Sequence, residues 1–171
     1  MKPYHIKLGV ILFCFSTLMF SCQVEDEEDT DTSTVPTGFN VDGQKLVDLV
    51  NQQRTQGCIC GSEQMPPVNP ISWNETLAKA AYLHSKDMSE NNYFSHTGKN
   101  GSDAGERIEN QGYIWRTYGE NIAEGYTTEE AVIEGWLNSE GHCKNIMKAS
   151  FEEMGVGREA NYWTQVFGAQ R

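Results

Sequence analysis

Beyond the N-terminal segment, three histidines and one glutamate are the residues best suited to chemistry. His96 lies in the stretch YFSHTG (residues 93–98), between two aromatic residues and a glycine-rich segment, and functional side chains concentrate on loops of this kind. Glu120 belongs to the motif GENIA, where a carboxylate stands beside apolar residues. His142 follows an expected helix. His84 falls on the apolar face of another expected helix, which favours a packed, hydrogen-bonded imidazole.

Two imidazoles and one carboxylate are a ligand set that zinc accepts, with water in the fourth position. His96, His142 and Glu120 therefore form a candidate metal site. The same three residues could form a metal-free cluster in which the carboxylate orients an imidazole. The sequence has no HEXXH helix, so it does not indicate a metalloprotease. Ser95 and Ser139 lack the GXSXG setting of an esterase nucleophile.

Hydrophobic spacing and capping signals predict the helices that position these residues. A helix over 42–54 ends at Gly57, and a Gly- and Pro-rich loop follows it. The next helix starts at Ser72–Glu75, which has the Ser-x-x-Glu form of a capping box, and carries His84. Further helices are expected at 103–111, from Thr127 to about Trp136, and over a turn or two at 141–147.

The C-terminal part is rich in β-forming residues. Strands are expected at 154–157 and 162–167, with a turn at 158–161 between them, and another near 118–122. Helices that precede an antiparallel pair of strands indicate an α+β layered domain.

Composition limits the function. The 171 residues include 24 acidic and 13 basic side chains, a formal net charge of −11, and 38% of residues are hydrophobic. This length fits one domain with a tail, and the composition is too polar for a protein with several membrane spans. The acidic balance argues against a nucleic-acid partner, which requires clustered lysine and arginine.

The N-terminus has the features of an export signal. Lys2 and Lys7 precede the apolar run 8–20, which is too short to span a membrane comfortably. The run ends in LMFSC, which resembles the lipobox of bacterial lipoproteins. We expect a lipoprotein signal peptide at 1–21 and acylation of Cys22, which would anchor the chain in the envelope membrane. Ordinary signal cleavage with Cys22 incidental is the alternative.

Residues 22–38 are expected to form an acidic, disordered tether, because such a charge block stays solvated. An acidic stretch after the acylated cysteine also resembles the surface-export signal of some Bacteroidetes lipoproteins. It indicates a surface-exposed position on the outer membrane.

Five sequence blocks, in order, resemble those of the CAP superfamily, which includes cysteine-rich secretory proteins, antigen 5 and pathogenesis-related proteins; the bacterial SCP-like branch is most similar. The resemblance covers about residues 42–168. The resemblance implies a three-layer α-β-α sandwich with an antiparallel sheet over residues 39–171. The blocks are WNxxLAxAA (73–81), YFSHTG (93–98), GENIA (119–123), GWxxSxGHxxNI (135–146) and YWTQVF (162–167).

The resemblance also implies a cavity lined by two histidines and two acids that can bind a divalent metal, often zinc. His96 would be the first histidine and Glu120 the first acid. The second histidine of the eukaryotic pattern is replaced by Tyr162, and His142 is expected to take its place. The position of the second acid holds serine, and the adjacent Glu140 is the candidate.

Three cysteines remain in the domain: Cys58, Cys60 and Cys143. An exported protein is expected to form a disulfide, and three cysteines cannot all pair within one chain. We predict one bridge between the Cys58–Cys60 loop and Cys143, without ranking the two loop cysteines. The alternative is a thiolate site in which Cys143 joins His142 at a metal.

The leading functional hypothesis is an exported binding or interaction module with a polar cavity at His96, Glu120 and His142. Its partners would be the membrane, through the lipid anchor, and a small hydrophobic ligand or an envelope protein. The alternatives are a metal-assisted hydrolase of the envelope, acting as a peptidase or esterase, and a purely structural polar cluster.

Overall fold

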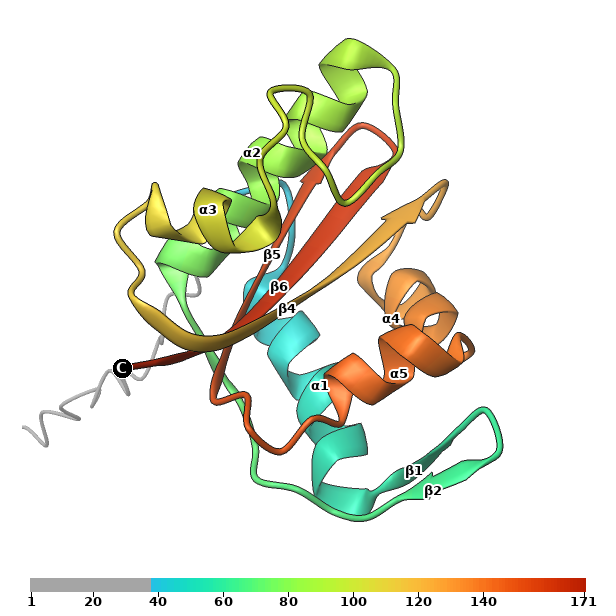
Figure 1. The fold of residues 1–171 in the computed structure, drawn as a ribbon. Coiled ribbons are helices and arrows are strands. Elements are labelled where there is room, and N and C mark those ends of the chain that lie inside the picture. Colours follow the sequence, from blue (N-terminus) through green and yellow to red (C-terminus); the bar gives the residue numbers. More distant parts are fainter. Residues whose placement is uncertain (1–37) are drawn as a thin grey trace, which may run out of the picture. The chain divides into compact units, whose positions relative to one another are not determined.

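The computed structural model describes residues 38–171 (Figure 1). The signal peptide expected at 1–21, the acylated Cys22 and all but the last residue of the expected tether lie outside the described residues. Within the described part, no helix is both long and apolar enough to span a membrane. The elements are α1 (Gly43–Gln56), β1 (Cys58–Cys60), β2 (Glu63–Met65), β3 (Ser72–Trp73), α2 (Glu75–Asn91), α3 (Ala104–Glu109), β4 (Trp115–Glu124), α4 (Glu129–Leu137), α5 (Glu140–Ile146), β5 (Glu153–Glu159) and β6 (Tyr162–Gln170).

A four-stranded sheet in the order β3-β5-β6-β4 forms the middle layer. Strands β5, β6 and β4 pair antiparallel, and the short edge strand β3 pairs parallel with β5. Helices α2 and α3 lie on one face of the sheet, and α1, α4 and α5 lie on the other (Figure 1). The predicted α+β three-layer sandwich is confirmed, with the parallel edge strand as an addition to the antiparallel sheet.

Two local predictions were wrong. Ser72 does not cap α2, because Ser72–Trp73 pairs with β5. Asn74 is the cap, and its side-chain oxygen accepts hydrogen bonds from the backbone N–H groups of Thr76 (2.9 Å) and Leu77 (3.1 Å). The stretch after Gly57 is not a plain loop, because β1 and β2 form an antiparallel hairpin in it.

Helix α2 lies unusually close to the sheet because two glycines face it. A Cβ atom at Gly155 would collide with the backbone of Ala78, and one at Gly157 would collide with the backbone of Tyr82. Only glycine permits this separation, so the sequence GVG in β5 sets how near α2 comes to the sheet. That distance fixes the position of His84, which α2 carries.

The opposite face holds the larger apolar core. Trp136 and Trp163 are fully buried there, and the rings of Phe151 and Phe167 stack with centroids 5.2 Å apart. Cys60 and Cys143 form a disulfide with their Cα atoms 5.5 Å apart, which joins the hairpin to α5. The predicted bridge is confirmed, and Cys60 is the loop partner.

Arg54 is a buried cation on α1 that the sequence analysis did not single out. Its side chain is wholly inaccessible to solvent and donates to four backbone carbonyls, those of Asn69 (2.8 Å), Ile146 (2.7 Å), Lys148 (3.1 Å) and Phe151 (3.1 Å). Burial lowers the pKa of the guanidinium. One side chain thereby joins α1 to the segment before β3, to the C-terminal end of α5 and to the turn between α5 and β5.

Candidate functional site

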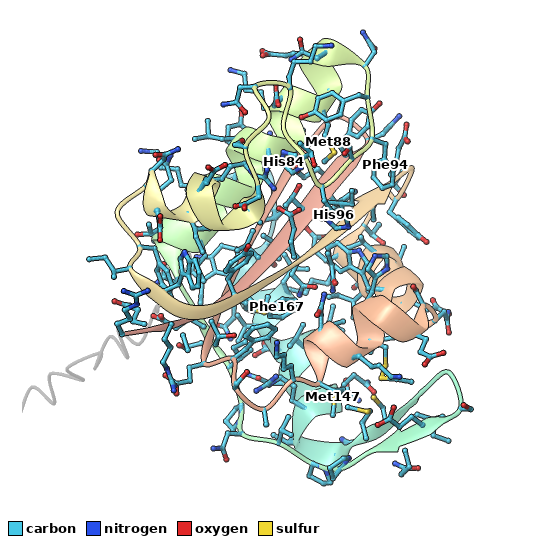
Figure 2. All side chains as sticks on the ribbon, viewed as in Figure 1. His84, Met88, Phe94, His96, Met147 and Phe167 are labelled. Atoms are coloured by element: carbon cyan, nitrogen blue, oxygen red, sulfur yellow. A yellow bond between two sulfur atoms is a disulfide. The ribbon has the colours of Figure 1, made fainter. Side chains whose placement is uncertain are left out.

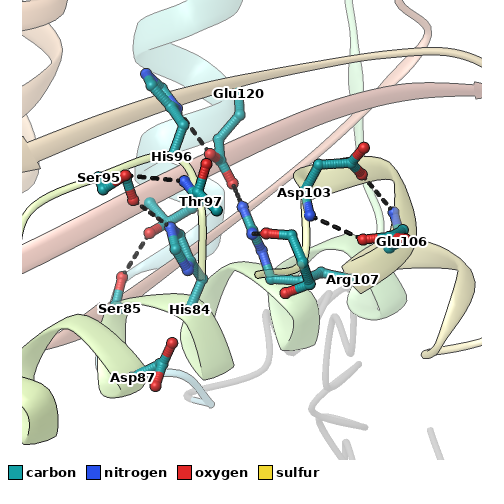
Figure 3. A network of polar contacts seen from close by, with 12 residues as sticks. His84, Ser85, Asp87, Ser95, His96, Thr97, Asp103, Glu106, Arg107 and Glu120 are labelled. Carbon is teal, nitrogen blue, oxygen red and sulfur yellow. Dashed lines mark hydrogen bonds and ion pairs between the residues drawn. The ribbon is translucent and has the colours of Figure 1, made fainter. Parts of the chain in front are cut away.

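Glu120, His96 and Arg107 form a chain of polar contacts across the α2 face of the sheet (Figure 3). Glu120 lies on β4 with 4% of its side chain exposed. One carboxylate oxygen lies 2.8 Å from Nδ1 of His96, and the other lies 2.6 Å from Arg107. The structure therefore brings together two of the predicted site residues and adds an arginine that was not predicted.

This arrangement fixes the orientation of the His96 imidazole. Because a carboxylate accepts, Nδ1 of His96 carries the proton that it donates to Glu120. The neutral ring then presents Nε2 as an acceptor or metal ligand, and 58% of the His96 side chain is exposed. Arg107, anchored on the carbonyl of Ser102 (2.8 Å), balances the buried charge of Glu120.

His84 supports the loop that carries His96. It is 1% exposed, and its Nε2 donates to the carbonyl of Ser95, 2.9 Å away. Burial lowers the pKa of His84, so the ring is held in its neutral form. The expectation of a packed, hydrogen-bonded helix histidine is confirmed. Figure 2 shows His84 on α2, with His96 on the loop that follows this helix.

His142 lies on α5 beside a small cavity of about 310 Å³. The cavity is bounded mainly by aromatic and aliphatic side chains, among them Phe94, which is half exposed. Phe94 and His96 lie on the same loop (Figure 2). Burial lowers the pKa of His142, and the neighbouring imidazole of His96 adds to this effect. The lining residues are Phe94, Ile122, Ala123, Glu124, Tyr126, Gly135, Trp136, Ser139 and His142.

Three side-chain amides, none of them among the predicted site residues, hold α5 against β4. Asn145 donates to the backbone carbonyl of Glu120 (3.1 Å) and to the Asn121 side chain (2.9 Å). Asn121 donates to the carbonyl of His142 (3.2 Å) and to the side chain of Gln165 (3.0 Å). These amides belong to the blocks GENIA, GWxxSxGHxxNI and YWTQVF, so three of the recognised motifs meet here to position two site residues.

Glu140 does not join this cluster. Its carboxylate is exposed and lies 2.6 Å from Lys144, which also contacts Glu63 of the hairpin at 2.9 Å. The hydrogen bond from Lys144 lowers the pKa of Glu140. The side chain thus belongs to a surface ion pair near the disulfide.

The three residues His96, Glu120 and His142 do not fit a compact three-ligand metal site as they are arranged. Within residues 38–171, the only His, Cys, Asp or Glu ligand atoms that gather as three within 4.8 Å are those of Cys58, Cys60 and Cys143. Both oxygens of Glu120 are also engaged, one of them by a cation. The geometry gives Glu120 the task of orienting His96.

Cys58 retains a free thiol beside the disulfide. Its sulfur lies 3.7 Å from that of Cys143 and 3.9 Å from that of Cys60. Burial raises the pKa of this thiol. Because Cys143 is bonded to Cys60, it is not available as a thiolate that joins His142 at a metal.

With this geometry established, similarity to known proteins identifies the family. A model of the cysteine-rich secretory protein family (CAP) matches residues 47–167. The chain belongs to this family. It is 35% identical to the uncharacterized protein YkwD of Bacillus subtilis over 143 residues, which are 82% of this chain and 52% of YkwD. It is 42% identical to the uncharacterized membrane protein YlbC of the same organism over 97 residues, 57% of this chain and 28% of YlbC.

Solved CAP structures have the same fold. An extracellular protein of Bacillus anthracis that contains a SCP domain superposes with a TM-score of 0.66 at 34% identity, covering 75% of this chain and 40% of the other. An outer surface protein of Borrelia burgdorferi superposes with a TM-score of 0.63 at 20% identity, covering 75% and 92%, a likeness that shows the fold alone. The chain spans about half, or less, of the length of the curated relatives that it matches.

Proposed function

We propose that this CAP-family chain is an exported, envelope-anchored binding module, and that its ligand site is the face formed by His96, His142 and the cavity beside Phe94. The apolar run and LMFSC at the N-terminus support export and lipid anchoring at Cys22. The extracellular SCP-domain protein of Bacillus anthracis, at 34% identity, supports the same location.

One observation carries the proposal. The buried chain from Arg107 through Glu120 fixes the ring of His96, yet leaves most of that side chain exposed. A rigidly oriented imidazole at the surface is what a binding site requires, since little conformational freedom is lost when a ligand docks. A purely structural cluster would not need to present its histidine to solvent.

The ligand we propose is a small amphipathic molecule. Its polar group would form hydrogen bonds with His96 and His142. Its apolar part would occupy the cavity lined by Phe94, Tyr126 and Trp136. The volume of about 310 Å³ suits a small ligand, and mostly apolar walls with a few polar groups are typical of such sites.

Zinc binding at this face would depend on the two imidazoles, with Glu120 behind His96. The lowered pKa of His142 keeps its ring in the neutral form that binds metals. A bound zinc ion would supply a Lewis acid to a ligand. We expect such a site to bind zinc more weakly than a site with three protein ligands would.

Isothermal titration with zinc and with a short-chain fatty acid tests the proposal. We expect binding of at least one of them by the wild-type protein, lost in His96→Ala and in His142→Ala, and retained in Glu140→Gln. Unfolding in urea shows whether each variant is folded. Folded variants that bind as the wild type does would contradict the proposed site. Hydrolysis of an envelope peptide or ester that disappears only in the two histidine variants would favour the hydrolase instead.

A further inference from the structure

A second cavity, of about 510 Å³, opens on the α2 side of the sheet. One wall is a single face of α2, because Ala80, Leu83, His84 and Asp87 follow the spacing i, i+3, i+4, i+7. The other wall comes from the loop before α3 and from the end of α3. Its residues are Lys99, Asn100, Ser102, Arg107, Asn110 and Gln111, and none of them lines the cavity at His142.

The second wall is rich in hydrogen-bond donors that the protein itself leaves unused. Arg107 has five N–H groups, and its contacts with Ser102 and Glu120 leave several of them unpaired. Within residues 38–171, the ammonium group of Lys99 forms no ion pair, and the side-chain amides of Asn110 and Gln111 form no hydrogen bond with the protein. Such a wall suits a ligand with a negative charge and several acceptor atoms.

The carboxylate of Asp87 also faces this cavity, and its oxygens are already engaged by uncharged hydrogen-bond donors. Asp87 accepts hydrogen bonds from the hydroxyl of Tyr93, from the backbone N–H of Lys99 (2.9 Å) and from the Asn91 side chain (2.8 Å). Its role is to hold the loop that carries Lys99. Among the residues that line the cavity, Lys99 is the cation without an ion-pair partner in the described part of the chain, whereas Arg107 is paired with Glu120.

The α2 wall contributes the apolar part. Ala80 is buried, and Leu83 leaves 42% of its surface exposed, although it is a large aliphatic residue. An exposed leucine beside a row of donors matches a molecule with an aliphatic group next to a carboxylate and an amide. The C-terminal residues of a peptide have this combination.

We propose that this cavity binds the α-carboxylate end of a short peptide. Lys99, together with the amides of Asn110 and Gln111, binds the carboxylate, and the face of Ala80 and Leu83 receives the small side chain. A volume of about 510 Å³ accommodates two or three small residues.

Titration of the ¹⁵N-labelled protein with N-acetyl-Ala-Ala, followed by NMR, tests the proposal. Shifts are expected at the signals of Lys99, Asn100, Asn110 and Gln111, and not at His142. The peptide methyl ester lacks the charge and should bind about fivefold more weakly. Free Ala-Ala, titrated in parallel, distinguishes a short free peptide from the terminus of a longer chain.

Two variants and a control make the result specific. Lys99→Gln should weaken binding of N-acetyl-Ala-Ala about threefold to fivefold. Leu83→Asp places a negative charge on the apolar wall at an exposed helix position and should weaken it at least about tenfold. Lys86 lies on the same helix and pairs with Glu90, and Lys86→Gln should leave binding of N-acetyl-Ala-Ala unchanged. Equal binding of acid and ester, or no shift at about 10 mM peptide, would overturn the proposal.

Discussion

The two faces of the sheet are covered by different kinds of side chain. On the side of α1, α4 and α5, stacked aromatic rings, the disulfide and the wholly buried Arg54 fill and fasten the interior. On the side of α2 and α3, two glycines bring a helix close to the sheet, and charged side chains and a large cavity take the remaining space. The difference indicates that the first face supplies most of the stability, and that the second can therefore accommodate buried charges.

The largest effect should follow loss of the disulfide. Cys60 and Cys143 are separated by 83 residues in sequence, and a bridge that closes a loop of this size stabilises a domain by about 4 kcal/mol. Replacing both cysteines with alanine should lower the free energy of unfolding in urea by about this amount. Cys58→Ala is the control, since its thiol is unbonded. A Cys58→Ala loss equal to that of the double variant would contradict the assignment of the bridge.

Arg54→Met tests how much the buried guanidinium contributes to the stability of the same face. Methionine fills similar space but leaves four carbonyls without their donor, so we expect a loss of about 3 kcal/mol in urea unfolding. Arg116→Met is the matched control, because the ion pair of Arg116 with Glu152 is exposed. If the free energy of unfolding falls by the same amount in both variants, the buried guanidinium does not stabilise the core.

On the other face, Glu120→Gln should have a smaller effect on stability. The amide keeps the shape of the side chain but removes the charge that balances Arg107, which should cost about 2 kcal/mol. The NMR signals of the His96 ring should also move, because its partner changes. Glu140→Gln, at the exposed pair with Lys144, should alter neither measurement.

Acidification should give the smallest effect. Burial lowers the pKa of His84, and burial together with the neighbouring His96 lowers that of His142, whereas a histidine in the unfolded chain titrates near pH 6.5. Below about pH 6.5 the unfolded chain therefore binds protons that the folded chain does not, so stability falls as the pH falls, by at most about 1.4 kcal/mol per pH unit for each histidine.

Urea unfolding at pH 7.5 and pH 5.5 measures this loss, and His84→Gln should reduce it. The carboxyls of Asp87 and Glu153, whose pKa values are lowered, titrate below this range and do not obscure it. A stability that rises between pH 7.5 and pH 5.5 would show that these histidines are not held neutral by burial.

Local and motif signals predicted much of the fold, and long-range pairing explains the exceptions. The sequence motifs indicated the three-layer sandwich, and the three cysteines of a chain expected to be exported indicated the bridge. Ser72 was misread as a cap because nothing local shows that it pairs with Glu153, far along the chain.

The site was predicted in part for similar reasons. His96 and Glu120 do meet, as their motifs indicated. Arg107 was missed because only the packing of α3 beside β4 brings it to Glu120. Glu140 is two residues from His142, but successive helical side chains are rotated by about 100°, so the two point in different directions. Sequence proximity alone therefore assigned Glu140 to the wrong surroundings.

The tautomer of the His96 ring shows directly whether Glu120 orients this imidazole. If Glu120 holds His96 through Nδ1, the neutral imidazole carries its proton on Nδ1 and leaves Nε2 unprotonated. Long-range ¹H–¹⁵N correlation spectra at pH 8 should show this tautomer in the wild-type protein and a mixture of both tautomers in Glu120→Gln. A wild-type ring with its proton on Nε2 would show that Glu120 does not hold His96 through Nδ1.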